Sequence, residues 1–476
     1  MSAPAPIIVW LRRDLRLQDN PAIAFAAAAG QPVIPLFIRS DQEKWSSGGA
    51  AQWWRGMSLA ALRQALREVG SDLVLRAGDP IAVLRDIAAS TGARRLAFNR
   101  SYEPADLRQD AEVHEAMGEF GVEVVEFPGN RLHEPWSVKT GGTGPYRVFT
   151  PFWRKLLDIY RPPPALPAPK ALAAPRHWPE GDDLATVRRR DPWTASLAAH
   201  WLPGEAGASA ALDAFVDNLV EAYGEQRDRP DVDGTSRLSP HLAWGEISVH
   251  EIWRRVTREA GAAGLGYLRE LGWRDFNSHL FYHFPDLPHR PWSASFRRFP
   301  FVKNAAALRA WQRGRTGYPL VDAGMRQLWQ TGWMHNRVRM VVGSFLVKDL
   351  LIDWRQGESW FWDTLVDADL AQNAGNWQWV AGCGADAAPF FRIFNPTTQG
   401  EKFDPQGAYI RRWVPELAAL PADCIHQPSA AAPLDLAGAG VVLGKTYPWP
   451  IVDHAKARSD ALTIYRTLSG KAPRDD

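Results

Sequence analysis

The chain has 476 residues, of which 46% are apolar and 23% are charged, which excludes a disordered or fibrous protein and leaves room for two or three domains. The net charge is +2, but residues 1–130 carry −2, so the remainder carries +4. Two cysteines, Cys383 and Cys424, exclude a disulfide framework and favour a reducing compartment, so we expect a cytoplasmic protein. No apolar run is long enough for a membrane helix, and the run at 7–11 does not fit a signal peptide.

The first 130 residues alternate between strand-like and helix-like segments. Apolar runs predict strands at 7–11, 33–38, 73–75, 96–98 and 122–127. Asn20-Pro21 and Asp79-Pro80 are typical of helix starts, because Asn or Asp caps the helix and proline fits its first turn. We therefore expect a Rossmann-like, mostly parallel α/β domain over residues 1–130. Ligands of such a sheet would lie near its carboxyl edge, at segments 11–20, 39–45 and 99–106.

Residues 131–208 predict an interdomain connector. An aromatic helix around 149–160 is followed by prolines up to Pro179, and a proline-rich chain stays extended. The glycine run at 141–144 lacks the Gly-Lys-Ser/Thr ending of a phosphate loop, so it predicts a turn. From 209 to 476 apolar residues recur at helical spacing, for example from Leu212 to Tyr223 before Gly224. We expect this last part to be an all-helical domain.

Three hydroxyls and an arginine come directly before a predicted helix at residues 235–240. Ser239 is the expected N-cap and Pro240 the first helical residue. The free N–H groups of a helix start, together with hydroxyl donors, suit a phosphate. Plain capping needs only one of the hydroxyls, so both interpretations stay open.

Glu270, Trp273 and Arg274 share one face of a predicted helix. A carboxylate, an indole and a guanidinium suit a flat heteroaromatic ligand, although a surface ion pair beside a core tryptophan would give the same spacing. His279 and His283 are spaced like metal ligands, but no third ligand is recognisable, so we expect no metal.

A basic stretch covers residues 286–345, with ten Lys and Arg against two Asp, a local charge of +8. It suits a polyanion partner or a well-solvated helical surface. Residues 333–340 combine aromatic, amide and cationic side chains, and a buried arginine there needs a carboxylate, which Asp367 or Asp369 could supply ahead of Asn373.

These motifs, in this order, resemble the DNA photolyase/cryptochrome family. The matching segments are residues 9–16, 235–240, 273–274, 316–323, 333–340, 377–379 and 391–402. The resemblance extends over the whole chain apart from the connector and about the last fifty residues. The resemblance implies an α/β domain followed by a helical domain that binds FAD and DNA, and the bacterial cyclobutane pyrimidine dimer photolyases are the most similar branch.

The resemblance implies that reduced FAD is bound in the helical domain. The implied cofactor-binding residues are Tyr223, Thr235, Ser236, Arg237, Leu238, Ser239, Glu270, Arg274, Asn336, Arg339, Asp367, Asp369 and Asn373. Arg339 would pair with Asp367, and Asn373 would face flavin N5, where a neutral amide tolerates a reduced, anionic flavin better than a carboxylate would.

The implied activity is light-driven repair of ultraviolet-damaged DNA. Excited FAD would pass an electron to a flipped-out cyclobutane pyrimidine dimer, which then splits, so the enzyme would be a carbon–carbon lyase. The implied catalytic residues are Glu270, Asn336, Met340, Trp273 and Trp379, with Glu270 hydrogen-bonding the base edge. The implied DNA-binding residues are Arg227, Trp273, Arg274, Arg337, Trp379, Arg392 and Lys402. We expect a monomer with no membrane or metal partner.

Related branches remain as alternatives: a cryptochrome-like blue-light receptor, or a photolyase for the (6-4) photoproduct. Asn336 and Met340 stand where (6-4) enzymes carry paired histidines, and Asn373 stands where plant-type cryptochromes usually carry Asp. Both differences favour the dimer photolyase.

Two positions depart from the family pattern. Trp377 and Trp354 match the inner two members of the family's electron-transfer chain, but Phe301 stands at the outer position, and phenylalanine is far harder to oxidise. We hypothesise that Trp329, Trp333 or a nearby tyrosine ends the chain instead, or that photoreduction is slow. Residues 102–106 also lack the Asn-Glu pair of folate binders, so an antenna pigment could be methenyltetrahydrofolate, with Asp106 as acceptor, or a deazaflavin.

Overall fold

The computed structural model describes residues 4–40, 47–142, 144–189, 191–386 and 391–469. Most of the predicted ligand segment at 39–45, and one position of the glycine run at 141–144, lie outside these residues. The chain forms two compact units. The first comprises Met1–Glu221, Ser236–Pro285 and Val366–Asp369, and the second comprises Ala222–Thr235, Asp286–Leu365 and Leu370–Asp476.

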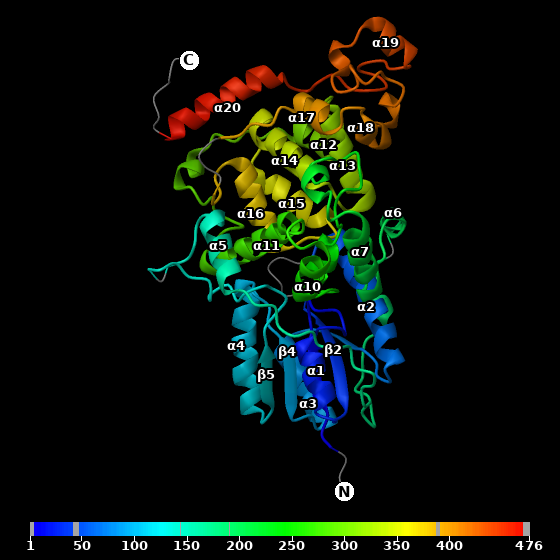
Figure 1. The fold of residues 1–476 in the computed structure, drawn as a ribbon, viewed down its shortest axis with the longest axis vertical. Coiled ribbons are helices and arrows are strands. Elements are labelled where there is room, and N and C mark those ends of the chain that lie inside the picture. Colours follow the sequence, from blue (N-terminus) through cyan, green and yellow to red (C-terminus); the bar gives the residue numbers. More distant parts are fainter. Residues whose placement is uncertain (1–3, 41–46, 143, 190, 387–390, 470–476) are drawn as a thin grey trace. The chain divides into compact units, whose positions relative to one another are not determined.

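A five-stranded parallel sheet forms the base of the first unit (Figure 1). Its strands are β1 (Ile7–Leu11), β2 (Val33–Arg39), β3 (Val74–Ala77), β4 (Arg95–Asn99) and β5 (Glu123–Phe127). The order is β3-β2-β1-β4-β5, so the winding direction reverses between β1 and β4. The predicted Rossmann-like parallel sheet is confirmed, with every strand within two residues of its expected bounds.

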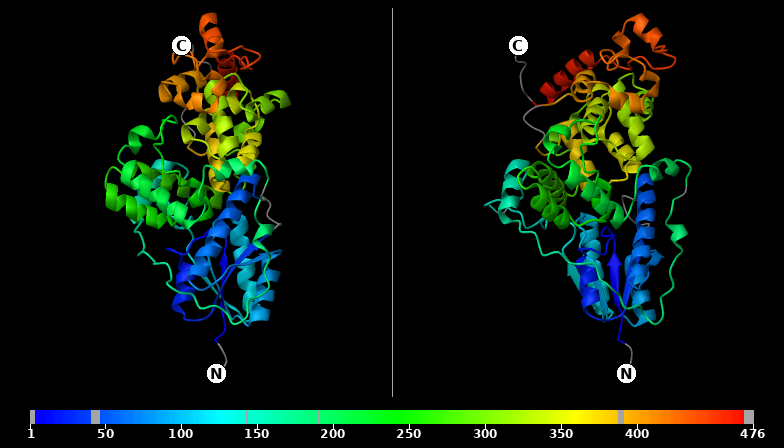
Figure 2. Two further views of the ribbon diagram at one scale, coloured as in Figure 1. Left: turned by 90° about the vertical axis from the view of Figure 1, so that its right-hand side faces the viewer. Right: turned by 45° about the vertical axis from the view of Figure 1, so that its right-hand side comes forward.

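Helices cover both faces of this sheet (Figure 2), as right-handed crossovers in a doubly wound sheet require. These helices are α1 (Pro21–Ala28), α2 (Gly49–Glu68), α3 (Pro80–Thr91) and α4 (Pro104–Glu119). Asn20 and Asp79 cap α1 and α3 as predicted, since their side chains accept hydrogen bonds from the N–H groups of Ile23 (3.2 Å) and Ala82 (2.9 Å).

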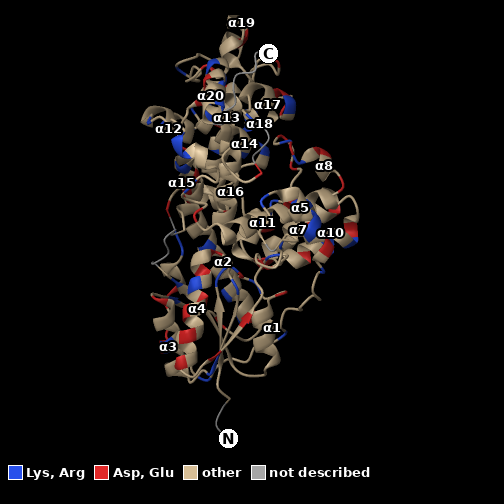
Figure 3. Ribbon diagram, turned by 90° about the vertical axis from the view of Figure 1, so that its left-hand side faces the viewer, with Lys and Arg blue, Asp and Glu red and all other residues tan. Residues whose placement is uncertain are grey.

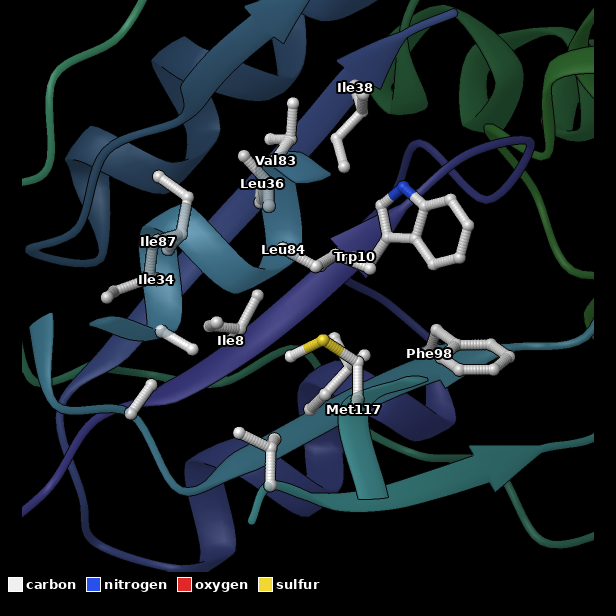
Figure 4. Packing of buried hydrophobic residues seen from close by; sticks show 14 of the residues in the cluster. Ile8, Trp10, Ile34, Leu36, Ile38, Val83, Leu84, Ile87, Phe98 and Met117 are labelled. Carbon is white, nitrogen blue, oxygen red and sulfur yellow. The ribbon is translucent and has the colours of Figure 1, made fainter. Parts of the chain in front are cut away.

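The core beneath α3 and α4 is made of aliphatic side chains and Met117, with Trp10 and Phe98 at one side (Figure 4). Alternate residues of each strand point to this face, so Ile8 and Trp10 of β1 lie beside Ile34 and Leu36 of β2. Burial of these side chains fixes the sheet register and thus which loops meet at the carboxyl edge.

The remaining helices of the first unit follow the sheet in the chain. They are α5 (Phe149–Ile159), α6 (Thr194–Ala198), α7 (Glu205–Asn218), α9 (Ser239–Trp244), α10 (Val249–Ala260) and α11 (Leu265–His283), with a 3-10 turn η1 (Leu184–Thr186). The proline-rich segment 161–179 has no regular structure, as expected. The prediction of one helix running to Gly224 was wrong, because α7 ends at Asn218, where Leu219 leaves helical geometry.

The second unit is helical in every element that the structure describes. Its helices are α8 (Tyr223–Gln226), α12 (Ala305–Gln312), α13 (Pro319–Thr331), α14 (Asn336–Ser344), α15 (Trp354–Thr364), α16 (Leu370–Ala381), α17 (Pro396–Phe403), α18 (Ala408–Trp413), α19 (Pro433–Gly438) and α20 (His454–Ser469). Shorter turns are η2 (Ala294–Arg298), η3 (Phe345–Asp349, a π-helical turn), η4 (Pro415–Leu417) and η5 (Pro428–Ala430). Of the described helices, none is both long and apolar enough to cross a membrane.

Candidate functional site

The hydroxyl-rich segment before α9 makes polar contacts within the first unit. The Ser236 hydroxyl lies 3.0 Å from the Tyr267 hydroxyl, and Ser239 donates a hydrogen bond to Asp367 (2.7 Å). Arg237 has a φ of 51°, in the left-handed region that side chains rarely adopt, and such strain is typical of functional segments. The segment thus holds hydroxyl and guanidinium donors in a short, fixed stretch of chain.

The predicted capping role of Ser239 was wrong. Helix α9 starts at Ser239 itself, and the residue before it, Leu238, makes no side-chain cap. The Ser239 hydroxyl is engaged by Asp367 Oδ2, while Pro240 stands in the first helical turn as expected. The hydroxyl therefore links α9 to the short segment around residue 367.

Arg274 and Asp369 lie in a buried charge cluster that also contains Arg131. The Arg131 guanidinium contacts Asp369 Oδ2 (3.2 Å) and donates to the Ser278 hydroxyl (2.7 Å). Arg274 donates to the backbone carbonyls of Asn130 (2.7 Å) and Leu242. Burial, followed by the nearby Arg131 charge, lowers the pKa of Arg274 to about 9. Sequence reasoning missed Arg131, because an arginine in a turn gives no periodic signal.

This cluster borders a cavity in the first unit that is partly open to solvent. Its walls come from the segments after β1, β4 and β5, together with α9, α11 and Asp369, so it lies at the carboxyl edge where the sequence predicted ligands. Five arginines and three carboxylates line it: Arg12, Arg13, Arg100, Arg131, Arg274, Asp14, Glu103 and Asp369. Asp106, the expected pterin acceptor, accepts a hydrogen bond from Ser101.

Helix α11 presents the predicted Glu270–Trp273–Arg274 face. All three side chains are partly buried. The indole of Trp273 stacks on the ring of Phe149, with centroids 3.7 Å apart and planes 9° apart. Further along α11, His279 bonds to the Pro135 carbonyl through Nδ1 (2.7 Å), and burial lowers its pKa to about 4.

In the second unit, α14 carries Asn336 and Met340 one turn apart. Asn336 is exposed and Met340 is half-buried. Arg337 forms an ion pair with Asp228 (2.5 Å) and lies over the Phe403 ring. Arg339 Nε donates to the Met334 carbonyl (2.8 Å). Asp367 belongs to the other unit, so its pairing with Arg339 stays a prediction.

Helix α16 carries three more of the predicted residues of this unit. Asn373 is buried, and its Nδ2 donates to the backbone carbonyl of Glu358 (2.9 Å). Trp377 is 4% exposed and lies directly against Gly357. Trp379 is half-buried, with the exposed Arg392 guanidinium 5.6 Å from the centre of its ring.

The other predicted contacts of the second unit cluster around two aromatic rings. The Arg227 guanidinium lies 5.4 Å from the centre of the buried Tyr223 ring. Lys402, at the exposed end of α17, lies 5.1 Å from the centre of the Phe403 ring. Figure 3 shows basic residues on α17, whereas acidic residues run along α4 of the first unit.

Comparison with known proteins gives the same assignment along the whole chain. Residues 7–170 match the family model described as DNA photolyase, and residues 267–467 match the model described as the FAD binding domain of DNA photolyase. A deoxyribodipyrimidine photo-lyase of Agrobacterium fabrum is 50% identical over 98% of both chains. The chain belongs to the DNA photolyase family.

This photolyase is also similar to a solved photolyase structure and to a plant cryptochrome. The crystal structure of a class III photolyase from Agrobacterium tumefaciens superposes with a TM-score of 0.95, at 49% identity and 99% coverage of both chains. Cryptochrome-1 of Arabidopsis thaliana is 40% identical over 95% of this chain and 69% of its own length. The fold predicted from the sequence, with a helical FAD-binding domain, is confirmed.

FAD is the cofactor of this family domain, and the residues present fit it. The segment 236–239 holds two hydroxyls, bonded here to Tyr267 and Asp367, beside a strained Arg237, and hydroxyl and guanidinium groups are suitable phosphate ligands. Asn373 itself is a neutral amide bonded to the Glu358 backbone, and burial raises the pKa of the Glu358 carboxyl to about 9, which keeps it protonated at neutral pH. A neutral environment suits an isoalloxazine ring that becomes negatively charged on reduction.

Proposed function

We propose that this photolyase splits cyclobutane pyrimidine dimers in ultraviolet-damaged DNA. The observation that carries the proposal is the face of α11, where Glu270 and Trp273 lie one turn apart and are both only partly buried. A flipped-out pyrimidine offers an apolar face to an indole and a polar edge to a carboxylate. One helix face can therefore contact both the apolar face and the polar edge of the base.

FAD, when bound and reduced, supplies under blue light the single electron that cleavage of the cyclobutane ring requires. The protein's own residues select and hold the lesion. Glu270 hydrogen-bonds the base edge, Trp273 and Trp379 provide apolar walls, and Asn336 and Met340 contact the flipped pair. Water exclusion by the aromatic walls strengthens the hydrogen bond from the base edge to Glu270.

The same proposal assigns the cofactor and DNA contacts. FAD phosphates would be held by Tyr223, Thr235, Ser236, Arg237, Leu238 and Ser239, and the rest of FAD by Glu270, Arg274, Asn336, Arg339, Asp367, Asp369 and Asn373. DNA phosphates would be held by the exposed Arg392 and Lys402 and by Arg227. Arg337 is already paired with Asp228, so it contributes less to phosphate binding.

We also propose a division of roles along the chain. Residues 1–130 form the antenna side, 131–208 the connector, and 209–476 the part that binds FAD and DNA. The cavity at the carboxyl edge of the sheet is where an antenna pigment, a folate or a deazaflavin, would be sought. Absorbance of the purified protein beyond that of its flavin would show such a pigment.

The test uses the FAD-loaded, chemically reduced protein and an oligonucleotide that contains one thymine cyclobutane dimer. Recovery of thymine absorbance under blue light, and none in the dark, is expected. Glu270→Gln and Asn336→Ala should slow this recovery. Bound FAD without any recovery would contradict the proposal and favour a blue-light receptor or a (6-4) photolyase.

A further inference from the structure

The stacking of Trp273 on Phe149 is unusually close. Aromatic pairs normally lie offset or edge-to-face with centroids 4.5–7 Å apart. Here the centroids are 3.7 Å apart and the planes differ by 9°, so the two rings lie almost directly over one another. Phe149 is completely buried, whereas Trp273 is only partly buried. The buried ring therefore fixes the plane of a partly exposed one.

Phe149 is itself held from several sides. Trp153, one turn later on α5, lies nearly parallel to it, with centroids 6.2 Å apart, and Phe276 of α11 meets it edge-on at 5.8 Å. Trp153 can lie directly against helix α11 because residue 272 of that helix is a glycine: a Cβ there would lie 2.3 Å from the Trp153 ring. Because these neighbours leave little room, the Phe149 ring has one stable orientation.

A positive charge completes the arrangement. The Arg269 guanidinium, one turn before Trp273 on α11, lies 5.3 Å from the centre of the Phe149 ring. A cation near a ring attracts its negative face, and this attraction offsets part of the repulsion between two directly overlaid rings. Arg269, Phe149 and Trp273 therefore form a ladder that spans α5 and α11.

We propose that Phe149 is a positioning residue for lesion recognition, which holds the Trp273 indole in the orientation needed to stack on a flipped-out pyrimidine. This inference rests on the proposed function, in which Trp273 forms a wall of the lesion pocket. An indole that is ordered before binding loses little freedom when the lesion arrives, so the stack favours damaged over undamaged DNA. Undamaged DNA, which is held through its phosphates and presents no flipped-out base, gains no affinity from the ordered indole.

The experiment measures dark binding, without turnover, by fluorescence anisotropy. The FAD-loaded protein is titrated with labelled oligonucleotides that are identical except for one thymine dimer. We expect Phe149→Leu to weaken dimer binding about 10-fold while leaving undamaged DNA unchanged. Phe149→Met, whose flexible unbranched side chain can follow the space left by the ring, should have the same effect if the leucine variant does not fold.

Phe152 provides the matched control, because it is also fully buried on α5 and its ring neighbours are Tyr146, Phe276 and His279. Phe152→Leu should keep the discrimination between the two oligonucleotides. Equal losses in Phe152→Leu and Phe149→Leu would mean that general packing is responsible, and would overturn the inference.

A double variant separates positioning from a merely structural role. If Phe149 acts through the indole, the Phe149→Leu/Trp273→Ala variant should bind the dimer no more weakly than Trp273→Ala alone. Additive losses would overturn the inference. If Trp273→Ala itself keeps full discrimination, the assignment of Trp273 in the proposed function fails first. If only Trp273→Ala loses it, the proposed function stands and the role of Phe149 is refuted.

Discussion

The amide of Asn373 has one defined partner, since its Nδ2 donates to the Glu358 backbone carbonyl in a buried position. That bond fixes which end of the amide carries the oxygen. A carboxylate at this position could not donate to the carbonyl and would add a negative charge to a site where Glu358 stays protonated. The hydrogen bond to the Glu358 carbonyl therefore requires a donor, and so an uncharged amide, at position 373.

We therefore expect Asn373→Asp to shorten the lifetime of reduced flavin in air several-fold, because a carboxylate disfavours a second negative charge nearby. The decay is followed by the return of oxidised-flavin absorbance. Asn376→Asp is the control, since Asn376 is an exposed residue of the same helix that donates to the Gln372 carbonyl. An equal effect of both substitutions would contradict the assignment of Asn373.

The contact between α15 and α16 depends on a residue without a side chain. A Cβ at Gly357 would lie 2.1 Å from Trp377 Cη2, inside the distance that any real Cβ shows. The indole of Trp377 also meets Phe361 edge-on at 5.0 Å, so it has little freedom to retreat. Packing of these two helices therefore requires glycine at 357.

Gly357→Ala should lower the free energy of unfolding by about 1–3 kcal/mol through overpacking. Denaturant unfolding of both variants measures the effect. Gly118→Ala on α4 is the control, because a Cβ there meets nothing within 4 Å and alanine favours the helix. A Gly357 variant as stable as the control would show that Trp377 is free to move.

A second link between elements concerns electron supply. Trp360 of α15 stacks on Trp329 of α13, with centroids 5.9 Å and planes 7° apart, and Trp329 is 53% exposed. Trp360 adjoins Phe361, whose ring meets Trp377. The outer family position is Phe301, so the exposed stacked pair is the candidate end of the chain. Because phenylalanine is hard to oxidise, Phe361 would separate Trp360 from Trp377 without carrying the charge itself.

Trp329→Phe should then slow photoreduction of the oxidised flavin by an external reductant several-fold. Trp449→Phe, at another exposed tryptophan, should leave the rate unchanged. The measurement is the loss of oxidised-flavin absorbance under blue light. An unchanged rate in the Trp329 variant would place the exit elsewhere, with Trp333 the next residue to replace.

At the scale of the whole molecule, two buried groups give the stability a pH dependence. Burial raises the pKa of Glu358 from 4.5 to about 9, so the folded state keeps a proton that the unfolded chain releases above pH 4.5. Stability from this group is therefore lost as pH rises. Burial lowers the pKa of Lys348 to about 7, which acts in the opposite sense, but only above pH 7.

Between pH 5 and 7 the wild-type protein should therefore lose about 2.5 kcal/mol of unfolding free energy relative to Glu358→Gln, which cannot titrate. Denaturant titrations of both proteins at several pH values test this, and taking the difference cancels the histidines common to both. A constant difference across this range would mean that Glu358 is ionised in the folded protein.

The fold could be predicted from the sequence because its signals are local. The five apolar runs, the caps at Asn20 and Asp79 and the helix expected around Glu270–Arg274 depend on near neighbours in the chain, and the structure reproduces them. Family resemblance then supplied the cofactor and the reaction, because its motifs are long and ordered. The end of α7 escaped prediction, since Leu212 to Tyr223 keep an apolar period although the helix stops at Asn218.

The contacts of the candidate site were decided by tertiary structure. From the sequence, the Ser239 hydroxyl could cap a helix or bind a phosphate, and only the placement of residue 367 beside α9 shows that it bonds to Asp367. Arg131 reaches Asp369 across 238 positions of sequence, and Phe149 lies on Trp273 although 124 residues separate them. Periodicity describes one element at a time, whereas these pairs depend on how separate elements pack, so their chemistry became visible only in the folded chain.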